Sequence, residues 1–290
     1  MKKLFGLLSV VLVAVICFTQ PVDAAKKEKR AKYVFYFIGD GMGINQVNGT
    51  EMYRGELDNK IGITPLLFTQ FPSVTVATTY ATNNGITDSA ASGTALATGN
   101  KTKYSTIGML EDQKTPVNSI AVWAKNQGSR VGIATSVSID HATPAAFYAH
   151  QPNRKMYYEI GMDLTKSGFD FFAASDFLLP QGKDGKQPSL YKLAEQAGYT
   201  LYRGYDEYRK GDKKEKVILF QPKGKPNKSI PYAIDRKSDD LSLQEIVKAG
   251  IDFFSKDLSK GFFFMVEGGE IDWACHSNDA ATVFREVIDM

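Results

Sequence analysis

The sequence predicts an α/β fold, with a doubly wound, mostly parallel sheet that carries helices on both faces. Apolar runs of strand length alternate with helix-forming segments along most of the chain, which is typical of parallel β-α-β units. Several of these runs end in polar or glycine-flanked residues, as strands do at the ligand-binding edge of an open α/β sheet. A chain of 290 residues is also long enough for one large domain with a sizeable core.

The expected elements follow one another along the chain. Apolar runs rich in β-branched and aromatic residues predict strands at residues 33–38, 73–79, 131–137, 169–173, 216–220 and 261–266. A helix is expected to begin at Ser89, and others at residues 117–127, 190–197, 242–255 and 280–290. The helix at 242–255 opens on a capping box, Ser242-Leu243-Gln244-Glu245.

The N-terminus has the features of a secretory signal peptide. Two lysines precede an apolar run over residues 4–18, and a small-residue cleavage pattern ends at Ala24. The apolar run is short for a bilayer, so we expect no stable membrane span. Cleavage near Ala24 predicts a periplasmic or secreted protein. The domains expected are the signal peptide at 1–24, a flexible basic N-terminus at 25–32 and the α/β domain at 33–290.

The charge distribution gives no sign of nucleic-acid binding. The formal net charge is +3, and lysine and arginine are spread along the chain rather than clustered, apart from the stretch at 26–32. No basic stretch is interleaved with aromatic residues, so we expect no nucleic-acid-specific binding.

The segment from Gly85 to Ala95 places a serine at the start of a helix of small residues. Thr87 or Asp88 can cap this helix, which puts the Ser89 hydroxyl in its first turn. Backbone N–H groups and the positive end of the helix dipole favour an anion there. Ser89 is therefore a candidate nucleophile for an anionic substrate. The alternative is a capped helix whose small residues only permit close packing.

The strand at 33–38 ends in Gly39-Asp40-Gly41. Ligands of an open α/β sheet bind beyond the carboxyl ends of its strands, so Asp40 is a candidate metal ligand, with glycines that let the backbone approach. The alternative is an ordinary Asp-Gly turn at the end of a strand.

Two other strands are followed by polar residues. The strand at 131–137 precedes Asp140-His141-Ala142-Thr143-Pro144 and then Arg154, whose guanidinium can clamp phosphate oxygens, although a lone arginine is more often solvated. The strand at 261–266 runs into Glu267. Asp272 and His276 are four residues apart and share a face if they are helical, and carboxylate with imidazole suits zinc. The alternative is an acidic loop.

Together these segments resemble the alkaline phosphatase family, in order and in approximate spacing, from about residue 32 to residue 290. The resemblance implies an alkaline phosphatase-like fold and hydrolysis of phosphate monoesters through a phosphoserine. It implies two Zn²⁺ and one Mg²⁺, and a homodimer for the full-length protein. Ser89 matches the nucleophile, and Arg154, oriented by Asp88, matches the phosphate clamp. The implied metal ligands are Asp40, Ser89, His141, Thr143, Glu267, Asp272 and His276.

The resemblance has two departures. Family members carry a further Asp-His pair and another histidine beyond the segment that ends at His276, whereas this chain has three histidines in all. We therefore expect a chain incomplete at its C-terminus, and residues 25–290 alone to be poorly soluble and nearly inactive. His141 stands where some members have aspartate, which leaves the third metal open.

Two other functions fit the sequence. One is a phosphodiesterase or sulfatase of the same superfamily, although no C/S-x-P-x-R motif surrounds Ser89. The other is an inactive, truncated form that only binds phosphate or metal.

Overall fold

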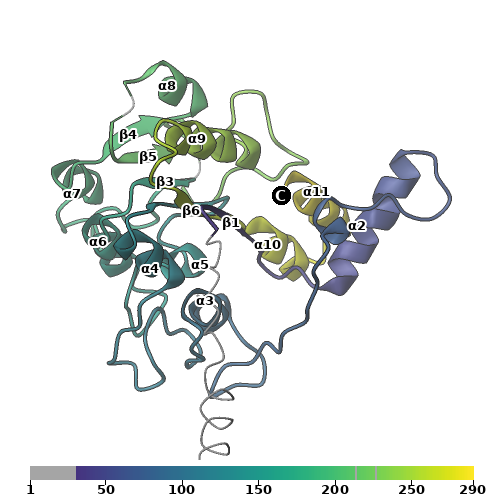
Figure 1. Cartoon of the computed structure of the whole chain (residues 1–290), viewed down its shortest axis with the longest axis horizontal. Coiled ribbons are helices and arrows are strands. Elements are labelled where there is room, and N and C mark those ends of the chain that lie inside the picture. Colours follow the sequence, from purple (N-terminus) through teal and green to yellow (C-terminus); the bar gives the residue numbers. More distant parts are fainter. Residues whose placement is uncertain (1–30, 213, 226) are drawn as a thin grey trace, which may run out of the picture. The chain divides into compact units, whose positions relative to one another are not determined.

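A computed structural model of the chain contains one six-stranded sheet within the residues it describes (Figure 1). Every neighbouring pair of strands is parallel, and the strand order is β1-β6-β2-β3-β5-β4. Parallel neighbours need crossover connections, which helices supply. The strands are β1 Tyr33–Gly39, β2 Arg130–Thr135, β3 Phe171–Ala174, β4 Thr200–Arg203, β5 Val217–Phe220 and β6 Phe262–Gly268.

The structure describes residues 31–212, 214–225 and 227–290. The predicted signal peptide at 1–24 and nearly all of the predicted basic segment at 25–32 lie outside the described residues. Residues Tyr33–Met290 form one compact unit. No helix in the described ranges combines the length and hydropathy needed to cross a bilayer.

Helices connect the strands and flank the sheet. Their bounds are α2 Ile44–Leu57, η1 Phe68–Gln70, α3 Ser89–Thr98, α4 Ile120–Asn126, α5 Ala142–Ala145, α6 Tyr157–Lys166, α7 Leu190–Gln196, α8 Tyr205–Lys210, α9 Leu243–Ser255, α10 Glu270–His276 and α11 Ala280–Asp289. The capping box predicted for α9 is present, because Ser242 and Glu245 each bond the other's backbone N–H.

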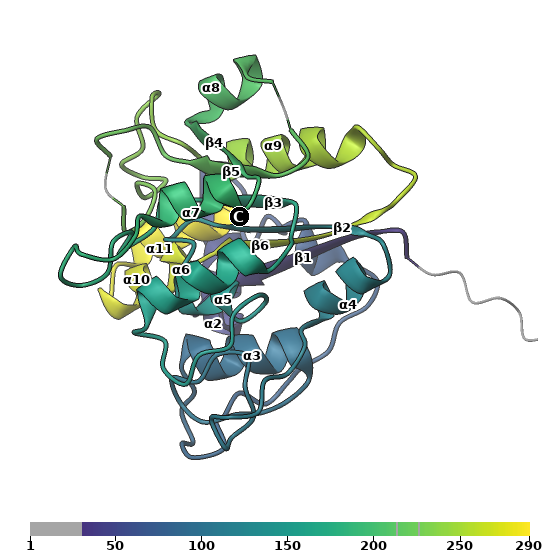
Figure 2. The ribbon, with the colours of Figure 1, turned by 90° about the vertical axis from the view of Figure 1, so that its left-hand side faces the viewer.

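Both faces of the sheet carry a hydrophobic core, as the doubly wound prediction requires (Figures 1 and 2). Ile133 and Phe172 pack into one core with residues of α3 to α7. On the other face, Phe171 and Phe264 pack with α9 and with Tyr208 of α8. Successive side chains of a strand point to opposite faces, so each buried strand serves both cores. The predicted α/β fold is confirmed.

One predicted strand is wrong. Residues 73–79 belong to no strand, and all seven are exposed. Their β-branched composition favours extended backbone, but within the described residues no neighbouring strand pairs with them. Lys101 holds the end of this segment instead, because its Nζ donates to the carbonyls of Thr78 at 3.0 Å and Tyr80 at 2.9 Å. The sequence patterns also missed η1, α5, α6, β4 and α8, which are short or lie next to polar loops.

The centre of the sheet brings three strand ends together. Strand β6 lies between β1 and β2, and Glu267 of β6 is in register with Ile38 on one side and Thr135 on the other. The residues that follow β1, β2 and β6 therefore emerge at the same edge. This edge is where an open α/β sheet binds its ligands.

Candidate active site

Ser89 begins α3 at this edge of the sheet. Asp88 caps the helix, since its carboxylate accepts from the Ala91 N–H at 3.1 Å. The Ser89 hydroxyl donates to Asp40 Oδ2 at 3.0 Å, across 49 residues of sequence. The helix comes close to α5 because a Cβ on Gly93 would lie only 3.4 Å from the Thr143 Cα. The small residues of α3 thus permit close packing and also bring Ser89 to the strand ends.

Asp40 follows β1 in a turn that only glycine fits well. Gly41 has φ +67°, and a Cβ there would lie 2.8 Å from the Cα of Asp272. The turn can therefore lie directly against α10. Burial and the nearby charge of Asp272 raise the pKa of Asp40 to about 6, while the Ser89 hydrogen bond and the Arg154 charge act in the opposite direction.

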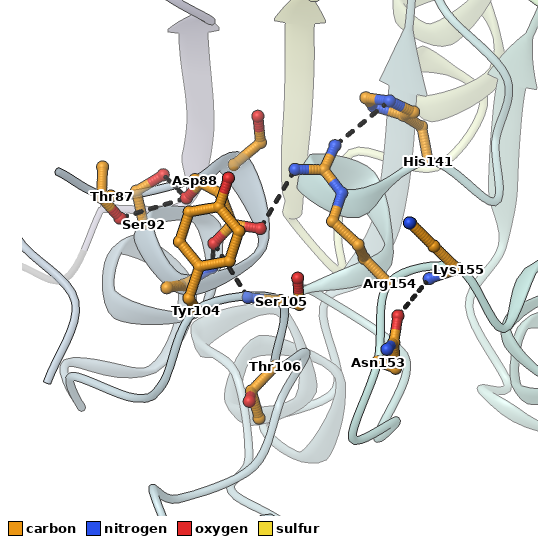
Figure 3. Close-up of polar contacts among 12 residues, drawn as sticks. Thr87, Asp88, Ser92, Tyr104, Ser105, Thr106, His141, Asn153, Arg154 and Lys155 are labelled. Atoms are coloured by element: carbon orange, nitrogen blue, oxygen red, sulfur yellow. Dashed lines mark hydrogen bonds and ion pairs between the residues drawn. The ribbon is translucent and has the colours of Figure 1, made fainter. Parts of the chain in front are cut away.

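Arg154 lies between Asp88 and His141 (Figure 3). Its Nη1 pairs with Asp88 Oδ2 at 3.1 Å, and its Nη2 lies 3.3 Å from His141 Nε2. The backbone of Ser105 joins the same group, because its N–H donates to Asp88 at 3.1 Å and its carbonyl accepts from the Arg154 N–H at 2.8 Å. Arg154 is thus held in the site rather than left in solvent, and Asp88 next to Ser89 orients it.

Glu267, at the end of β6, is fully buried. It accepts a hydrogen bond from Thr135 Oγ1, but its other carboxylate oxygen has no partner. Thr143 Oγ1 and His141 Nδ1 are also buried without a partner. Burial, and next the charge of Asp40, raise the pKa of Glu267 to about 8. Burial and the positive charges of Arg154 and Lys228 lower the pKa of His141 to about 3, so this ring is neutral at neutral pH.

The oxygen atoms of the site fit a hard cation on the Glu267 side. Asp40, Thr143 and Glu267 offer oxygen donors, two of the unpartnered buried atoms are among them, and Mg²⁺ prefers such donors. A cation there would also offset the carboxylate charge that raises both acidic pKa values. His141 supplies an unpartnered nitrogen instead of a carboxylate.

The donors fit a zinc ion less completely. Asp272 and His276 share a face of α10, as predicted, with Oδ2 and Nε2 3.5 Å apart, but the His276 side chain is 80% exposed. In the described part of the chain, no three His, Cys, Asp or Glu side chains gather in a group that can hold a metal. Catalytic zinc usually has three protein ligands. The Asp272–His276 pair alone therefore offers fewer donors than a catalytic zinc ion usually has.

Three residues of the site were not found from the sequence. Ser105 has a left-handed backbone, with φ +69°, where it joins Asp88 to Arg154. Thr135 binds Glu267. Trp273 packs edge-on against the His141 ring, with centroids 5.8 Å apart. Only Thr135 carried a usable signal, because it lies near the end of the strand predicted at 131–137, next to Ser136.

Comparisons with known proteins identify the family of the chain. The alkaline phosphatase family model matches residues 31–168 and 179–290. Alkaline phosphatase 4 of Bacillus subtilis (strain 168) is 35% identical over 285 residues, and the human tissue-nonspecific isozyme is 30% identical over 311 residues. The matches cover 93% and 90% of this chain but 58% of each relative. The chain therefore spans a little over half the length of these curated relatives.

Solved structures show the same fold. The alkaline phosphatase from the Antarctic bacterium TAB5 superposes with a TM-score of 0.75 at 28% identity, over 89% of this chain and 71% of that one. The Thermus thermophilus alkaline phosphatase gives 0.78 at 27% identity, over 90% and 55%. A histidine-to-aspartate mutant of the TAB5 protein has Mg bound in its M3 site. Because the family model matches most of the chain's length, this chain belongs to the alkaline phosphatase family.

Proposed function

We propose that the protein is an exported alkaline phosphatase that hydrolyses phosphate monoesters through a phosphoserine at Ser89, with two zinc ions and one magnesium ion. One observation carries the proposal. The Ser89 hydroxyl, at a helix N-terminus, bonds Asp40, while the adjacent Asp88 holds the Arg154 guanidinium. A nucleophile, a cation-binding carboxylate and a phosphate clamp thus meet at one point. Export is supported by the signal-peptide pattern at 1–24.

The chain's own residues act in two displacements. In the first, Ser89 Oγ, whose hydroxyl donates to Asp40, loses its proton to water and attacks phosphorus; the P–O bond to the alcohol breaks, and the leaving oxygen takes a proton from water. Arg154 and the N–H groups at the start of α3 bind the non-bridging oxygens, whose charge they offset. In the second, water attacks the phosphoserine and loses a proton to solvent, the P–Oγ bond breaks, and Ser89 Oγ takes up a proton to become the hydroxyl again. Bound metal ions would acidify the serine and the water and polarise the phosphoryl group.

Asp40, Thr143 and Glu267 are the residues proposed to hold magnesium, with His141 at its edge. Asp40 and Ser89 are proposed to contact one zinc ion, and Asp272 with His276 the other. The choice of zinc and magnesium rests on the family resemblance. The buried oxygens without a hydrogen-bond partner support a magnesium ion at Thr143 and Glu267.

The charge of the substrate distinguishes a phosphomonoesterase from a phosphodiesterase. A monoester dianion carries one more charge than a diester, and the Arg154–Asp88 pair leaves guanidinium N–H groups to meet it. A second candidate for the chain as it stands is phosphate and metal binding without turnover. The exposure of His276 in its two-ligand pair favours this second function.

The test compares a chromogenic phosphate monoester with the matching diester on zinc- and magnesium-loaded protein. Ser89→Ala should remove monoester hydrolysis, because no oxygen replaces the nucleophile. Ser92→Ala is the control, since its hydroxyl lies one turn further along α3 and bonds only the Asp88 carbonyl at 2.8 Å. Diester turnover that exceeds monoester turnover would refute the proposal. Binding of phosphate and metal without turnover would favour the second candidate.

A further inference from the structure

Lys228 belongs to a segment that the sequence left without a function, yet its backbone is fixed at the edge of the site. Its carbonyl accepts from the Ser138 N–H at 3.0 Å, beyond the end of β2. The preceding carbonyl, of Asn227, accepts from Ser175 Oγ at 2.7 Å. On the other side, the Ser229 carbonyl accepts from Gln221 Nε2 at 2.8 Å. These hydrogen bonds fix the backbone of this exposed lysine and therefore the position of its Cα.

The side chain, although exposed, lies over an aromatic ring. Lys228 Nζ lies 4.6 Å from the centroid of the Trp273 indole. Trp273 packs against His141, and His141 Nε2 lies 3.3 Å from Arg154 Nη2. Figure 3 shows how His141 and Arg154 face each other. Two rings, Trp273 and His141, therefore connect the Lys228 ammonium to the guanidinium of Arg154.

The structure assigns Lys228 as a second phosphate-binding cation and a specificity-determining residue, held in place by Trp273. This inference rests on the proposed function of the site. Arg154 is already paired with Asp88 and can meet only part of a dianion's charge. The ammonium of Lys228 would bind the phosphate oxygens turned away from Arg154, directly or through one water.

Two features favour a role in binding over simple packing. A lysine that serves only to cover an indole needs no fixed backbone, because its long stem reaches the ring from many positions. The two cations also lie on neighbouring rings, because Lys228 lies over Trp273 while Arg154 lies beside His141, and these two rings pack together. Two positive charges gathered at the site favour the binding of an anion.

The test uses the metal-loaded full chain in a Trp123→Phe background. The sequence has two tryptophans, so Trp273 is then the only indole and its fluorescence reports on the site. Inorganic phosphate is titrated by fluorescence and by calorimetry. Lys228→Met keeps an apolar stem on the indole but removes the charge. We expect it to weaken phosphate binding about three- to fivefold, as for a partly exposed charge pair, and to reduce the salt dependence.

Controls separate the possible failures. Lys223→Met removes a charge from an exposed position of the same segment and should change phosphate affinity less than twofold. Lys228→Arg should restore binding. If Arg154→Ala weakens phosphate binding but Lys228→Met does not, Lys228 only packs on Trp273 and this inference is wrong, while the proposed function stands. If the unmutated site binds no phosphate, both are wrong.

Discussion

The carboxylates of Asp40 and Glu267, when ionised, destabilise the fold in the absence of a metal ion. Asp40 and Glu267 are buried close to one another, and burial raises both pKa values, to about 6 and about 8. A buried carboxylate without a cation is expensive to ionise, which is why such groups mark functional sites more often than structural ones. The chemistry of the site therefore predicts a trade-off between stability and ligand binding.

This trade-off has a definite pH dependence. Glu267 has a higher pKa folded than unfolded, so between about 4.5 and about 8 the folded state binds more protons and stability falls as pH rises. In a chelator, Glu267→Gln should therefore stabilise the protein at pH 8, by up to about 1.4 kcal/mol for each pKa unit removed, and change it little at pH 4. Urea unfolding at both pH values measures the difference.

The matched control is Glu56→Gln, on the exposed face of α2, which should give the same small change at both pH values. A stabilisation by Glu267→Gln that is equal at pH 4 and pH 8 would show that shape, rather than charge, controls this position.

Arg154 allows a second test of a single charge. Arg154→Ala should weaken inorganic phosphate binding by about 1.5–3 kcal/mol, the range for a hydrogen bond to a charged group, and raise KM more than it lowers kcat. Lys155→Ala, one residue along, should have little effect, because that side chain is exposed to solvent. Competitive inhibition by phosphate gives both values, and equal affinities in the two variants would contradict the assignment.

Part of the site can be predicted residue by residue from the sequence, and part cannot. Ser89 and Asp40 can be identified from the neighbouring sequence, because one lies at a helix start and the other at a strand end between glycines. Ser105 and Trp273 give no local signal, because their contacts join segments far apart in the chain. Such residues become visible only when the fold brings their partners together.

At the scale of an element, Asp88 both caps helix α3 and pairs with Arg154. Asp88 Oδ1 caps the helix through the Ala91 N–H, while Oδ2 pairs with Arg154. Asp88→Asn should keep the cap and the fold but lower phosphate affinity several-fold, since the amide orients Arg154 less firmly. Asp88→Ala should also lower the free energy of unfolding, by about 1 kcal/mol.

Urea unfolding and phosphate inhibition measure the two effects of Asp88 separately. Asp279→Ala provides the comparison, because Asp279 caps α11 in the same way, through the Thr282 N–H at 3.1 Å. It should destabilise without a change in phosphate affinity. If Asp88→Asn left phosphate binding unaltered, Asp88 would be a helix cap and nothing more.

The elements also show where sequence patterns stop being informative. The helix at 242–255 was predicted from its capping box, and its start is local chemistry that the structure confirms. Residues 73–79 have the composition of a strand, but a strand exists only with a neighbour to pair with. Composition therefore predicts extended backbone there, and pairing has to come from the rest of the fold.

For the whole molecule, the order of the sheet leaves β1 at an edge. One face of β1 packs on the core, but Tyr33, Phe35 and Phe37 on the other face are each more than 40% exposed. Exposed aromatic residues on a strand at the edge of the described sheet promote association. Phe35→Lys should therefore reduce self-association of the purified 290-residue chain, as measured by sedimentation velocity.

The control for the edge is Ile251→Lys, which adds the same charge at an exposed apolar residue of α9. It should leave the sedimentation profile of the chain unchanged. A similar fall in association for both variants would mean that net charge, rather than the β1 edge, keeps the molecules apart.

The account as a whole depends on Ser89 as the nucleophile, and one measurement tests this most directly. Metal-loaded protein is incubated with inorganic phosphate at acid pH, where a phosphoserine persists, then denatured in acid and digested. Mass spectrometry should find one phosphoryl group on the peptide that contains Ser89, and none on that of Ser89→Ala. A phosphoryl group on another residue, or equal labelling of Ser89→Ala, would contradict the account.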